Sequence, residues 1–426
     1  MRFIYTLVIY LLIPFVLLRL FFLGLNIPAY RTRWQERFGF FSWENKDKPV
    51  LWVHAVSVGE VNAATPIINF FLEQYPQYQI LVTTVTPTGA YTIKQNFGND
   101  VTHLYLPYDL PFSIKKFINT INPSILITME TEIWPNLYNV CEFSNIPILI
   151  VNARLSEKSS KGYRLVSGLM KQTLMKVNMI AAQTKKDAER FISFGADKDK
   201  VFVTGNLKFD ITVPHSITEE AESLKRYFSV NRPIWIAAST QEGEEEIVIK
   251  AHKKILIEYP DAILILAPRH PERVNKVAIL CESADIKFVK RTEQRRFSKD
   301  LNAYILDTLG ELQLHYAASQ IAFVGGSLVN TGGQNMMEPA SLGLPVISGL
   351  HTYNFKEITE LLSEQEALIS VSNEQELANE VCKLLSDANL RHNIGEKAQQ
   401  VIEKNKGNID RLIEIVEPYL SANETY

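Results

Sequence analysis

Short runs of apolar residues alternate along the chain with segments whose apolar residues recur at helical spacing. Each apolar run is typical of a buried strand, and strands separated by helices are typical of parallel βα units. The runs form two sets, one in each half of the chain. They end near Val53, Thr83, Ile127, Val151, Ala182 and Val203, and then near Ala237, Leu266, Leu306, Val324 and Ile347.

A polar segment broken by Pro214 and Pro233 separates the two sets. We therefore predict an α/β protein with two Rossmann-like, doubly wound domains facing a cleft. The predicted divisions are an anchor at 1–25, a first domain at 26–212, a linker at 213–232 and a second domain at 233–426. The last helical pattern, at 389–420, is long enough to pack back on the first domain. Nucleotide-sugar glycosyltransferases, sugar-nucleotide epimerases and some periplasmic-type binding proteins share this architecture, so it narrows function without fixing it.

The N-terminal segment has the pattern of a membrane anchor. Residues 3–18 carry no charge, and with the apolar residues after Arg19 the segment reaches the roughly 20 residues that a span needs. No small-residue cleavage site follows it. Three arginines, Arg31, Arg33 and Arg37, outnumber the positive charges before it, which places the main body in the cytoplasm. We predict an uncleaved inner-membrane anchor that either spans the bilayer or lies in one leaflet.

Composition and charge set further limits. The 426 residues are 46% hydrophobic and carry a net charge of −3, as in a globular protein, and they do not predict a nucleic-acid partner. Residues 1–215 hold 22 lysines and arginines against 16 acidic residues, which suits an anionic surface or substrate. The three cysteines have no CxxC spacing, which excludes a disulfide scaffold or a zinc site of that type.

Polar loops follow the strands of the first half. Glu60 ends the stretch HAVSVGE, directly after the first strand, and Glu130 and Lys208 follow later strands. Because Pro66 lies downstream, we expect the regular helix to start near Ala63, with residues 57–62 in a turn. The helix dipole is expected to keep Glu60 ionised, and a helix-end acid without catalytic function is the alternative interpretation.

The second half carries loops suited to a nucleotide. Arg269 follows a strand where a phosphate would lie, although a solvated arginine has the same pattern. Gly310 and Glu311 are expected at a helix start, whose amides bind anions. Asn335 is expected to cap a helix beginning at Met336, and Glu338 to bind a ribose diol. There is no P-loop motif and no clustered pair of aspartates, so neither a metal ion nor a cofactor is predicted.

These stretches together resemble one known family. The chain is similar to the 3-deoxy-D-manno-octulosonic acid (Kdo) transferases through HAVSVGE, TTVTPTG, METEIWPN, NARLS, GNLKFD, APRHPER, DTLGEL, GGSLVNTGGQNMMEP and HTYNF. The resemblance covers nearly the whole chain in order. It implies a GT-B fold and an inverting, metal-independent transfer of Kdo from CMP-Kdo. It implies as acceptor the glucosamine 6-hydroxyl of the lipid A precursor (lipid IVA), at the cytoplasmic face of the inner membrane, in lipopolysaccharide biosynthesis of Gram-negative bacteria.

The resemblance also implies roles for individual residues. Glu60 is expected to be the general base, and Glu130 and Lys208 to stabilise the transition state. The expected CMP site comprises Pro268, Arg269, Leu309, Gly310, Glu311, Asn335, Met336, Met337 and Glu338. One position departs from the family's pattern, since Gln334 stands where the family usually has a histidine. A role for an imidazole at this position is therefore not carried over.

Two other classes of function fit the same architecture. A different nucleotide-sugar transferase or an epimerase shares the fold, but an epimerase would not need the apolar segment at residues 3–25. A membrane-tethered sensor of sugar nucleotides would bind CMP-Kdo without turnover. Such a sensor would not be expected to place Glu60, Glu130 and Lys208 around one site.

Overall fold

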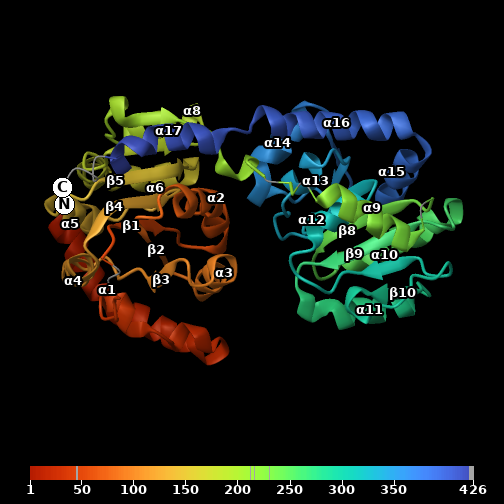
Figure 1. The fold of residues 1–426 in the computed structure, drawn as a ribbon, viewed down its shortest axis with the longest axis horizontal. Coiled ribbons are helices and arrows are strands. Elements are labelled where there is room, and N and C mark those ends of the chain that lie inside the picture. The colour runs from red at the N-terminus through yellow and green to blue at the C-terminus, as the bar shows by residue number, and fades with distance from the viewer. Residues whose placement is uncertain (45–46, 212, 215, 230, 422–426) are drawn as a thin grey trace. The chain divides into compact units, whose positions relative to one another are not determined.

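The computed structural model describes residues 1–44, 47–211, 213–214, 216–229 and 231–421. The chain forms two compact units, shown as ribbons in Figure 1. Unit 1 comprises residues 1–210 together with the C-terminal segment from Gly407, and unit 2 comprises Ile211–Lys406. Each unit contains a seven-stranded sheet in which the paired strands run parallel.

The sheet of unit 1 has the strand order β3-β2-β1-β4-β5-β6-β7. The order reverses between β1 and β4, which makes this pair the topological switch point. In open α/β sheets the loops at the carboxyl ends of the strands beside that point form the binding site. The strands are β1 (Val50–His54), β2 (Gln79–Thr84), β3 (Thr102–Tyr105), β4 (Pro123–Met129), β5 (Ile148–Ala153), β6 (Met179–Ala182) and β7 (Val201–Val203).

The sheet of unit 2 has the order β10-β11-β9-β8-β12-β13-β14, so its switch point lies between β8 and β12. It follows the same doubly wound plan, with β10 added beyond β11 at one edge. The strands are β8 (Ile234–Thr240), β9 (Ile263–Pro268), β10 (Phe288–Lys290), β11 (Ala303–Ile305), β12 (Ile321–Val324), β13 (Val346–Ser348) and β14 (Leu368–Ser370).

Helices connect the strands and cover the sheets. Unit 1 contains α1 (Arg2–Asn26), α2 (Val58–Gln74), α3 (Pro87–Phe97), α4 (Pro111–Ile121), α5 (Pro135–Phe143), α6 (Glu157–Arg164), α7 (Ser167–Leu174), α8 (Lys185–Ser193) and α17 (Asn408–Ser421). Unit 2 contains α9 (Ile217–Phe228), α10 (Glu244–Glu258), α11 (Val274–Ser283), α12 (Leu312–Ala318), α13 (Met337–Ser341), α14 (Lys356–Glu364), α15 (Glu374–Ser386) and α16 (Ala388–Lys404).

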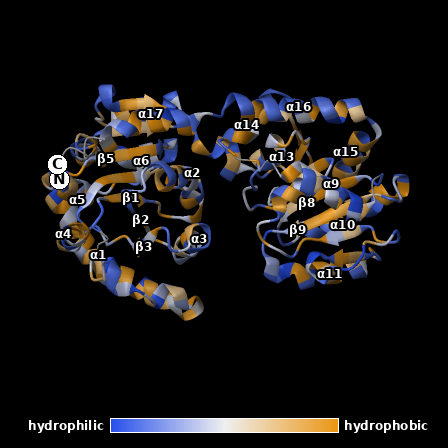
Figure 2. Ribbon diagram, in the orientation of Figure 1, coloured by the Kyte–Doolittle hydropathy of each residue, from blue (hydrophilic) through white to orange (hydrophobic). Residues whose placement is uncertain are grey.

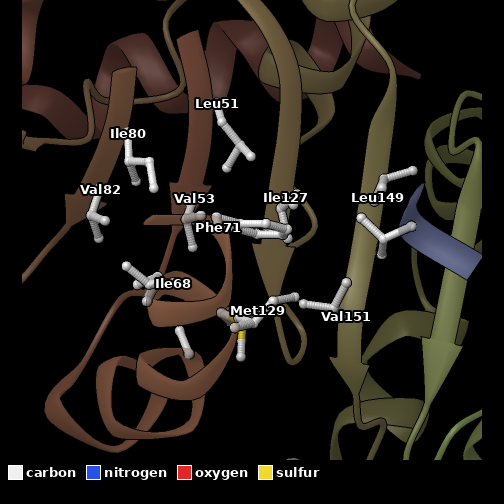
Figure 3. Close-up of a cluster of buried hydrophobic side chains, with 14 of the residues drawn as sticks. Leu51, Val53, Ile68, Phe71, Ile80, Val82, Ile127, Met129, Leu149 and Val151 are labelled. Atoms are coloured by element: carbon white, nitrogen blue, oxygen red, sulfur yellow. The ribbon is translucent and has the colours of Figure 1, made fainter. Parts of the chain in front are cut away.

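Helices bury both faces of each sheet. Successive strand residues point to opposite faces, so each strand contributes side chains to two apolar clusters. In β1, Leu51 and Val53 join one apolar cluster with α2, and Val50 and Trp52 join another with α4 and α5. Figure 3 shows the first cluster, in which Phe71 lies against side chains of the strands. Figure 2 shows the resulting distribution of hydropathy, in which the strands are largely hydrophobic and the helices contain both hydrophobic and hydrophilic residues.

The eleven predicted strands are all present, and three further strands were missed. The missed strands are β3, β10 and β14, each at an edge of its sheet. The prediction for α2 was wrong at its start, since the helix begins at Val58 and includes Pro66. Its buried face, which includes Val61 and Phe71, stabilises the helix despite the backbone donor that Pro66 lacks.

The unit boundaries differ from the predicted domains in two places. The segment predicted as a linker, 213–232, contains α9 within unit 2, where Phe228 is fully buried. The chain returns to unit 1 at Gly407, and α17 adds Leu412, Val416 and Leu420 to the core cluster around α2. Asn408 fixes the start of α17, because its Nδ2 donates to the carbonyl of Asn206 over 2.9 Å.

The N-terminal helix α1 is the candidate membrane span among the described residues. Its apolar stretch, Arg2–Leu25, is long enough to cross a membrane, and almost none of it is buried against the rest of the protein. Pro14 lies inside the helix. A helix of this length and composition is compatible with a membrane anchor.

Candidate active site

The candidate catalytic residues of unit 1 lie beside its switch point. Glu60 is in the first turn of α2, after β1, and Glu130 directly follows β4. One oxygen of Glu60 accepts the Val56 N–H over 2.9 Å, and the other accepts the Ser57 hydroxyl over 3.3 Å. These two donors leave part of the carboxylate's capacity for hydrogen bonds unused.

The charge state of Glu60 differs from the expectation. Burial, together with the negative charges of Glu132 and Glu130, raises its pKa to about 8. The bonds from Val56 and Ser57 lower the pKa, but they do not offset the loss of water. The prediction that the helix dipole keeps Glu60 ionised is therefore wrong, and Glu60 is a stronger base than an ordinary glutamate.

The structure brings Glu130 and Lys208 together, as predicted from their positions in loops that follow strands of the first half. Lys208 Nζ lies 3.0 Å from Glu130 Oε1 in a partly buried ion pair. Glu130 has φ +53°, a strained conformation for a residue other than glycine, and its N–H donates to the Val151 carbonyl over 3.0 Å. Strain of this kind persists where the surrounding structure holds it, often at functional sites.

A second motif holds the turn that carries Lys208. The turn is a short 3-10 helix, Leu207–Phe209, after β7. Asn152 of the NARLS stretch accepts the Leu207 N–H over 3.1 Å, and Asn206 accepts the Lys208 N–H over 3.1 Å. Asn152 is fully buried, so the position of Lys208 is set by the interior of unit 1.

The site includes three residues that were not given roles from the sequence, namely His54, Glu132 and Trp134. His54 is fully buried at the end of β1, and its Nε2 lies 3.8 Å from Glu132 Oε2. Trp134 Nε1 donates to the same Glu132 oxygen over 2.9 Å. In the sequence, His54 is recognisable only as a histidine at the end of an apolar strand, and that pattern is equally typical of a buried structural residue.

Unit 2 contains a pocket of about 480 Å³ at the carboxyl ends of its strands. Its lining includes six of the nine residues expected to bind CMP, namely Pro268, Arg269, Leu309, Gly310, Asn335 and Glu338. It also includes residues that the sequence did not single out, namely Ile211, Ser239, Ala267, Leu306, Thr308, Leu312 and Gln313. The volume lies in the range typical of small-molecule sites.

Asn335 and Glu338 form a linked pair in this pocket. Asn335 Nδ2 donates to Glu338 Oε1 over 2.9 Å, and Asn335 Oδ1 accepts the Met337 N–H over 3.1 Å. Burial raises the pKa of Glu338, while the Asn335 bond and the charge of Arg269 lower it. The helix begins at Met337, one residue after the prediction, and spans only five residues, so its dipole contributes little.

Three of the expected CMP residues lie outside the pocket lining. Met336 and Met337 are buried. The carboxylate of Glu311 pairs with Arg291 over 3.0 Å and accepts the Thr308 hydroxyl. Burial raises the pKa of Glu311, but these two partners outweigh it and hold the pKa below its ordinary value. Their expected contact with CMP stays a prediction.

A buried carboxylate that was not predicted from the sequence holds the glycine-rich loop that follows β12. Glu244, the first residue of α10, is fully buried and accepts four backbone N–H groups. They belong to Gly326 at 2.6 Å, Leu328 at 2.9 Å, Ser327 at 3.0 Å and Gln241 at 3.1 Å. Glu244 thus fixes the start of the glycine-rich loop that leads to Asn335.

Among the described residues, no group of three or more histidine, cysteine, aspartate or glutamate side chains is placed to hold a metal ion. The independence of metal that the resemblance implies remains a prediction, because this observation concerns only the protein's own ligands.

Comparison with known proteins agrees with this geometry. The family described as 3-Deoxy-D-manno-octulosonic-acid transferase (kdotransferase) matches residues 32–211, and the family Glycosyl transferases group 1 matches residues 246–401. The 3-deoxy-D-manno-octulosonic acid transferase of Haemophilus influenzae is 40% identical over 424 residues, which cover 99% of each chain. A probable mitochondrial 3-deoxy-D-manno-octulosonic acid transferase of Arabidopsis thaliana is 32% identical and covers 87% of this chain and 85% of its own.

A solved structure agrees on the fold alone. The UDP-GlcNAc 2-epimerase of Neisseria meningitidis, bound to UDP-GlcNAc, has a TM-score of 0.58 and 16% identity, covering 88% of this chain and 100% of that chain. The fold is thus of the GT-B type, and the full-length match to the Haemophilus transferase separates the chain from the epimerases. The chain belongs to the Kdo transferase family and is a glycosyltransferase of lipopolysaccharide biosynthesis.

Proposed function

We propose that this glycosyltransferase moves Kdo from CMP-Kdo to the glucosamine 6-hydroxyl of lipid IVA, with inversion and without a metal ion. The observation that carries the proposal is Glu60, a carboxylate at the switch point of unit 1 with a raised pKa and unused lone pairs. The ion pair of Glu130 and Lys208 belongs to the same set of strand-end loops. Such a site suits removal of a proton from an alcohol.

The reaction assigns a separate task to each side chain. Glu60 accepts the proton of the acceptor hydroxyl as the oxygen attacks the anomeric carbon of Kdo. The bond from that carbon to the phosphate oxygen breaks, and CMP leaves with the electron pair. Glu130 and Lys208 stabilise the charge that develops in the transition state. Attack opposite the leaving group inverts the anomeric centre.

The pocket of unit 2 supplies a site for the donor. Arg269 is exposed at its rim and suits the phosphate of CMP, because a guanidinium donates two parallel hydrogen bonds. Glu338 suits the ribose hydroxyls, which can donate to its carboxylate. Asn335 holds Glu338 through the 2.9 Å bond and so orients the acceptor atoms of the pocket.

The acceptor is a membrane lipid, which agrees with the apolar helix α1 on unit 1. We place the enzyme at the cytoplasmic face of the inner membrane, with Arg31, which is exposed directly after α1, facing anionic headgroups. The excess of lysine and arginine in residues 1–215 favours a phosphorylated acceptor.

Incubation with CMP-Kdo and a tetraacylated lipid A precursor tests the proposal, with products identified by mass spectrometry and the anomeric configuration by NMR. We expect a lipid product with added Kdo, an inverted anomeric centre and undiminished activity in EDTA. Replacement of CMP-Kdo by a UDP-sugar should give no product. Retention of configuration, strict dependence on Mg²⁺, or binding of CMP-Kdo without any turnover would each overturn a named part of the proposal.

A further inference from the structure

The first turns of α1 are bound to the interior of unit 1 through Asp109. This carboxylate is buried, and it accepts the hydroxyl of Tyr5 over 2.9 Å. It also accepts the N–H groups of Asn136 over 2.9 Å and Leu137 over 2.7 Å, both in the first turn of α5. The N-terminal part of α1 and the start of α5 therefore share one acceptor.

Asn136 makes a second connection between the same elements. Its side chain is fully buried, and its Nδ2 donates to the Asp109 carbonyl over 2.8 Å. Its Oδ1 accepts the hydroxyl of Thr6 over 3.0 Å. Two consecutive residues of α1 thus bind the two side chains that define where α5 begins.

The start of α5 is also the end of the loop that carries the candidate site. The loop runs from Glu130, directly after β4, to Trp134, directly before α5. Trp134 Nε1 donates to Glu132 Oε2 over 2.9 Å, and Glu132 is one of the charges that raise the pKa of Glu60. One end of this loop is held by the sheet, and the other is held partly by α1.

The chain after α1 binds unit 1 as well. Arg33 Nη2 donates to the His103 carbonyl over 2.8 Å, and Arg37 Nη2 donates to the Val85 carbonyl over 2.8 Å. From Tyr5 to the end of α1 the helix rises by about 30 Å, the thickness of a bilayer core. If α1 crossed the bilayer with Arg33 on the side of unit 1, Tyr5 would lie on the opposite side and could not reach Asp109.

The outward side of α1 is apolar and exposed. The side chains of Phe3, Leu7, Leu11, Phe15, Leu18 and Phe22 recur at helical spacing and are each more than 40% exposed. Tyr10, Ile13 and Pro14 line an open apolar pocket with Phe38, Phe40 and Leu110, and the Tyr10 side chain is about half exposed there. These apolar side chains suit contact with lipid, and the bonds from Tyr5 before them and from Arg33 after them connect both ends of this segment to unit 1.

We propose that α1 lies in the plane of the membrane surface and that its first turns position the Glu130–Trp134 loop of the candidate active site. Insertion of the outward face and the order of this loop would then be linked through Asp109 and Asn136. The effect on catalysis rests on the proposed function, whereas the order of the loop does not.

The double variant Tyr5→Phe, Thr6→Val tests the link, because it removes both hydroxyl donors and keeps α1 apolar. The full-length protein on vesicles of anionic phospholipid is compared with wild type by hydrogen exchange of residues 129–140, by sedimentation and by transfer kinetics. We expect faster exchange in that segment and unchanged vesicle binding. Turnover should fall about tenfold, as for two lost hydrogen bonds, with the KM for CMP-Kdo unchanged.

Tyr10→Phe is the matched control, since it removes a hydroxyl from the same helix, and it should leave all readouts at wild-type values. Thr6→Ser keeps its donor and, combined with Tyr5→Phe, should restore part of the turnover. Wild-type exchange and turnover in the double variant would overturn the positioning role. Faster exchange in a protein whose wild type transfers no Kdo would instead overturn the proposed function and leave the link intact.

The in-plane placement has its own test. The variant Arg2→Cys, in a Cys382→Ser background, is treated with a membrane-impermeant maleimide in sealed inverted inner-membrane vesicles, whose outer surface is cytoplasmic. The other two cysteines are buried. We expect labelling without detergent. Labelling only after detergent would show that α1 crosses the bilayer and would overturn the placement.

Discussion

Each unit has a glutamate in the first turn of the helix after its first strand, and the two glutamates are treated in opposite ways. Glu60 follows β1 and Glu244 follows β8, both beside the switch point of their sheets. Glu244 accepts four backbone N–H groups, whereas Glu60 accepts one N–H and one hydroxyl. The same position in the fold thus holds a carboxylate that accepts four hydrogen bonds in unit 2 and a carboxylate that accepts two in unit 1.

The number of accepted hydrogen bonds distinguishes a glutamate with a structural role from one that can act as a base. A carboxylate whose lone pairs are all occupied cannot take a proton from a substrate without releasing part of the fold. Glu244 therefore serves as a fixed acceptor of hydrogen bonds that shapes the glycine-rich loop. Burial removes water from the Glu60 carboxylate, and the protein donates fewer hydrogen bonds to it than it can accept. The pKa of Glu60 therefore rises, and the lone pairs that have no donor remain available to a substrate.

The largest expected effect is the loss of turnover in Glu60→Gln. This change keeps the shape of the side chain and removes the base, so turnover should fall by roughly 10²–10⁴-fold. The affinity for CMP-Kdo should stay near wild type, as measured by titration calorimetry. Glu73→Gln, at an exposed position of α2, should have no effect. Normal turnover in the Glu60→Gln variant would make Glu60 a helix-end acid and remove the contrast with Glu244.

Glu244→Gln should act on stability first. The amide nitrogen of glutamine would face N–H groups, and at least two of the four donors would lose their acceptor. The free energy of unfolding should fall by about 2–4 kcal/mol, measured by denaturant titration. Glu246→Gln, on the exposed side of the same helix, is the control. If Glu244→Gln kept full stability and lost only turnover, the assignment of a structural role would be wrong.

Arg269→Ala should weaken CMP binding by about 1.5–3 kcal/mol, the range for a hydrogen bond to a charged group. Titration of CMP against the full-length enzyme measures the effect. Glu338→Gln should weaken cytidine and CMP alike, because it concerns the ribose. Arg296→Ala, at an exposed position outside the pocket lining, should not alter CMP affinity. Equal losses for cytidine and CMP in Arg269→Ala would argue against a phosphate contact.

The smallest effect concerns pH. With a pKa of about 8, Glu60 is mostly protonated at pH 7 and mostly ionised at pH 9, so kcat/KM for the acceptor should rise about tenfold between them. A raised pKa also favours the folded state while Glu60 is protonated. Stability from this group is complete below about pH 4.5 and is lost as pH rises through 8.

Thermal unfolding across pH 5–9 checks this sign. The Tm of Glu60→Gln, relative to wild type, should be higher at pH 9 than at pH 5. A pH profile of kcat/KM that is flat from 6 to 9 would show that the pKa falls back toward its ordinary value when substrates bind.

The fold was largely predictable because the central strands are continuous apolar runs. The three missed strands, β3, β10 and β14, lie at sheet edges, where one side of the strand needs no partner. Their sequences, THLY, FVK and LIS, are too short and too mixed to stand out from loops. The start of α2 was missed because Pro66 was given more weight than the buried face of the helix.

The candidate site was predictable in its residues but not in its electrostatics. Glu60, Glu130 and Lys208 stand at recognisable strand ends, whereas the pKa of Glu60 depends on burial by the whole of unit 1. Three of the four partners of Glu244 are 82–84 positions away along the chain, and the partner of Tyr5 is 104 positions away. Contacts of such separation are set by tertiary structure and leave no local pattern.

The helix α17 gives the chain an order of assembly during synthesis. Leu412, Val416 and Leu420 complete the core cluster around α2, and α17 also contacts the turn that carries Lys208. The ribosome must make all of unit 2 before these residues emerge, which takes roughly 10–40 s at about 5–20 residues per second. During that interval the core of unit 1 is open at the place where α17 belongs. The nascent chain is therefore expected to depend on chaperones, and a message truncated near Lys406 should yield protein that aggregates although every residue of the candidate site has been translated.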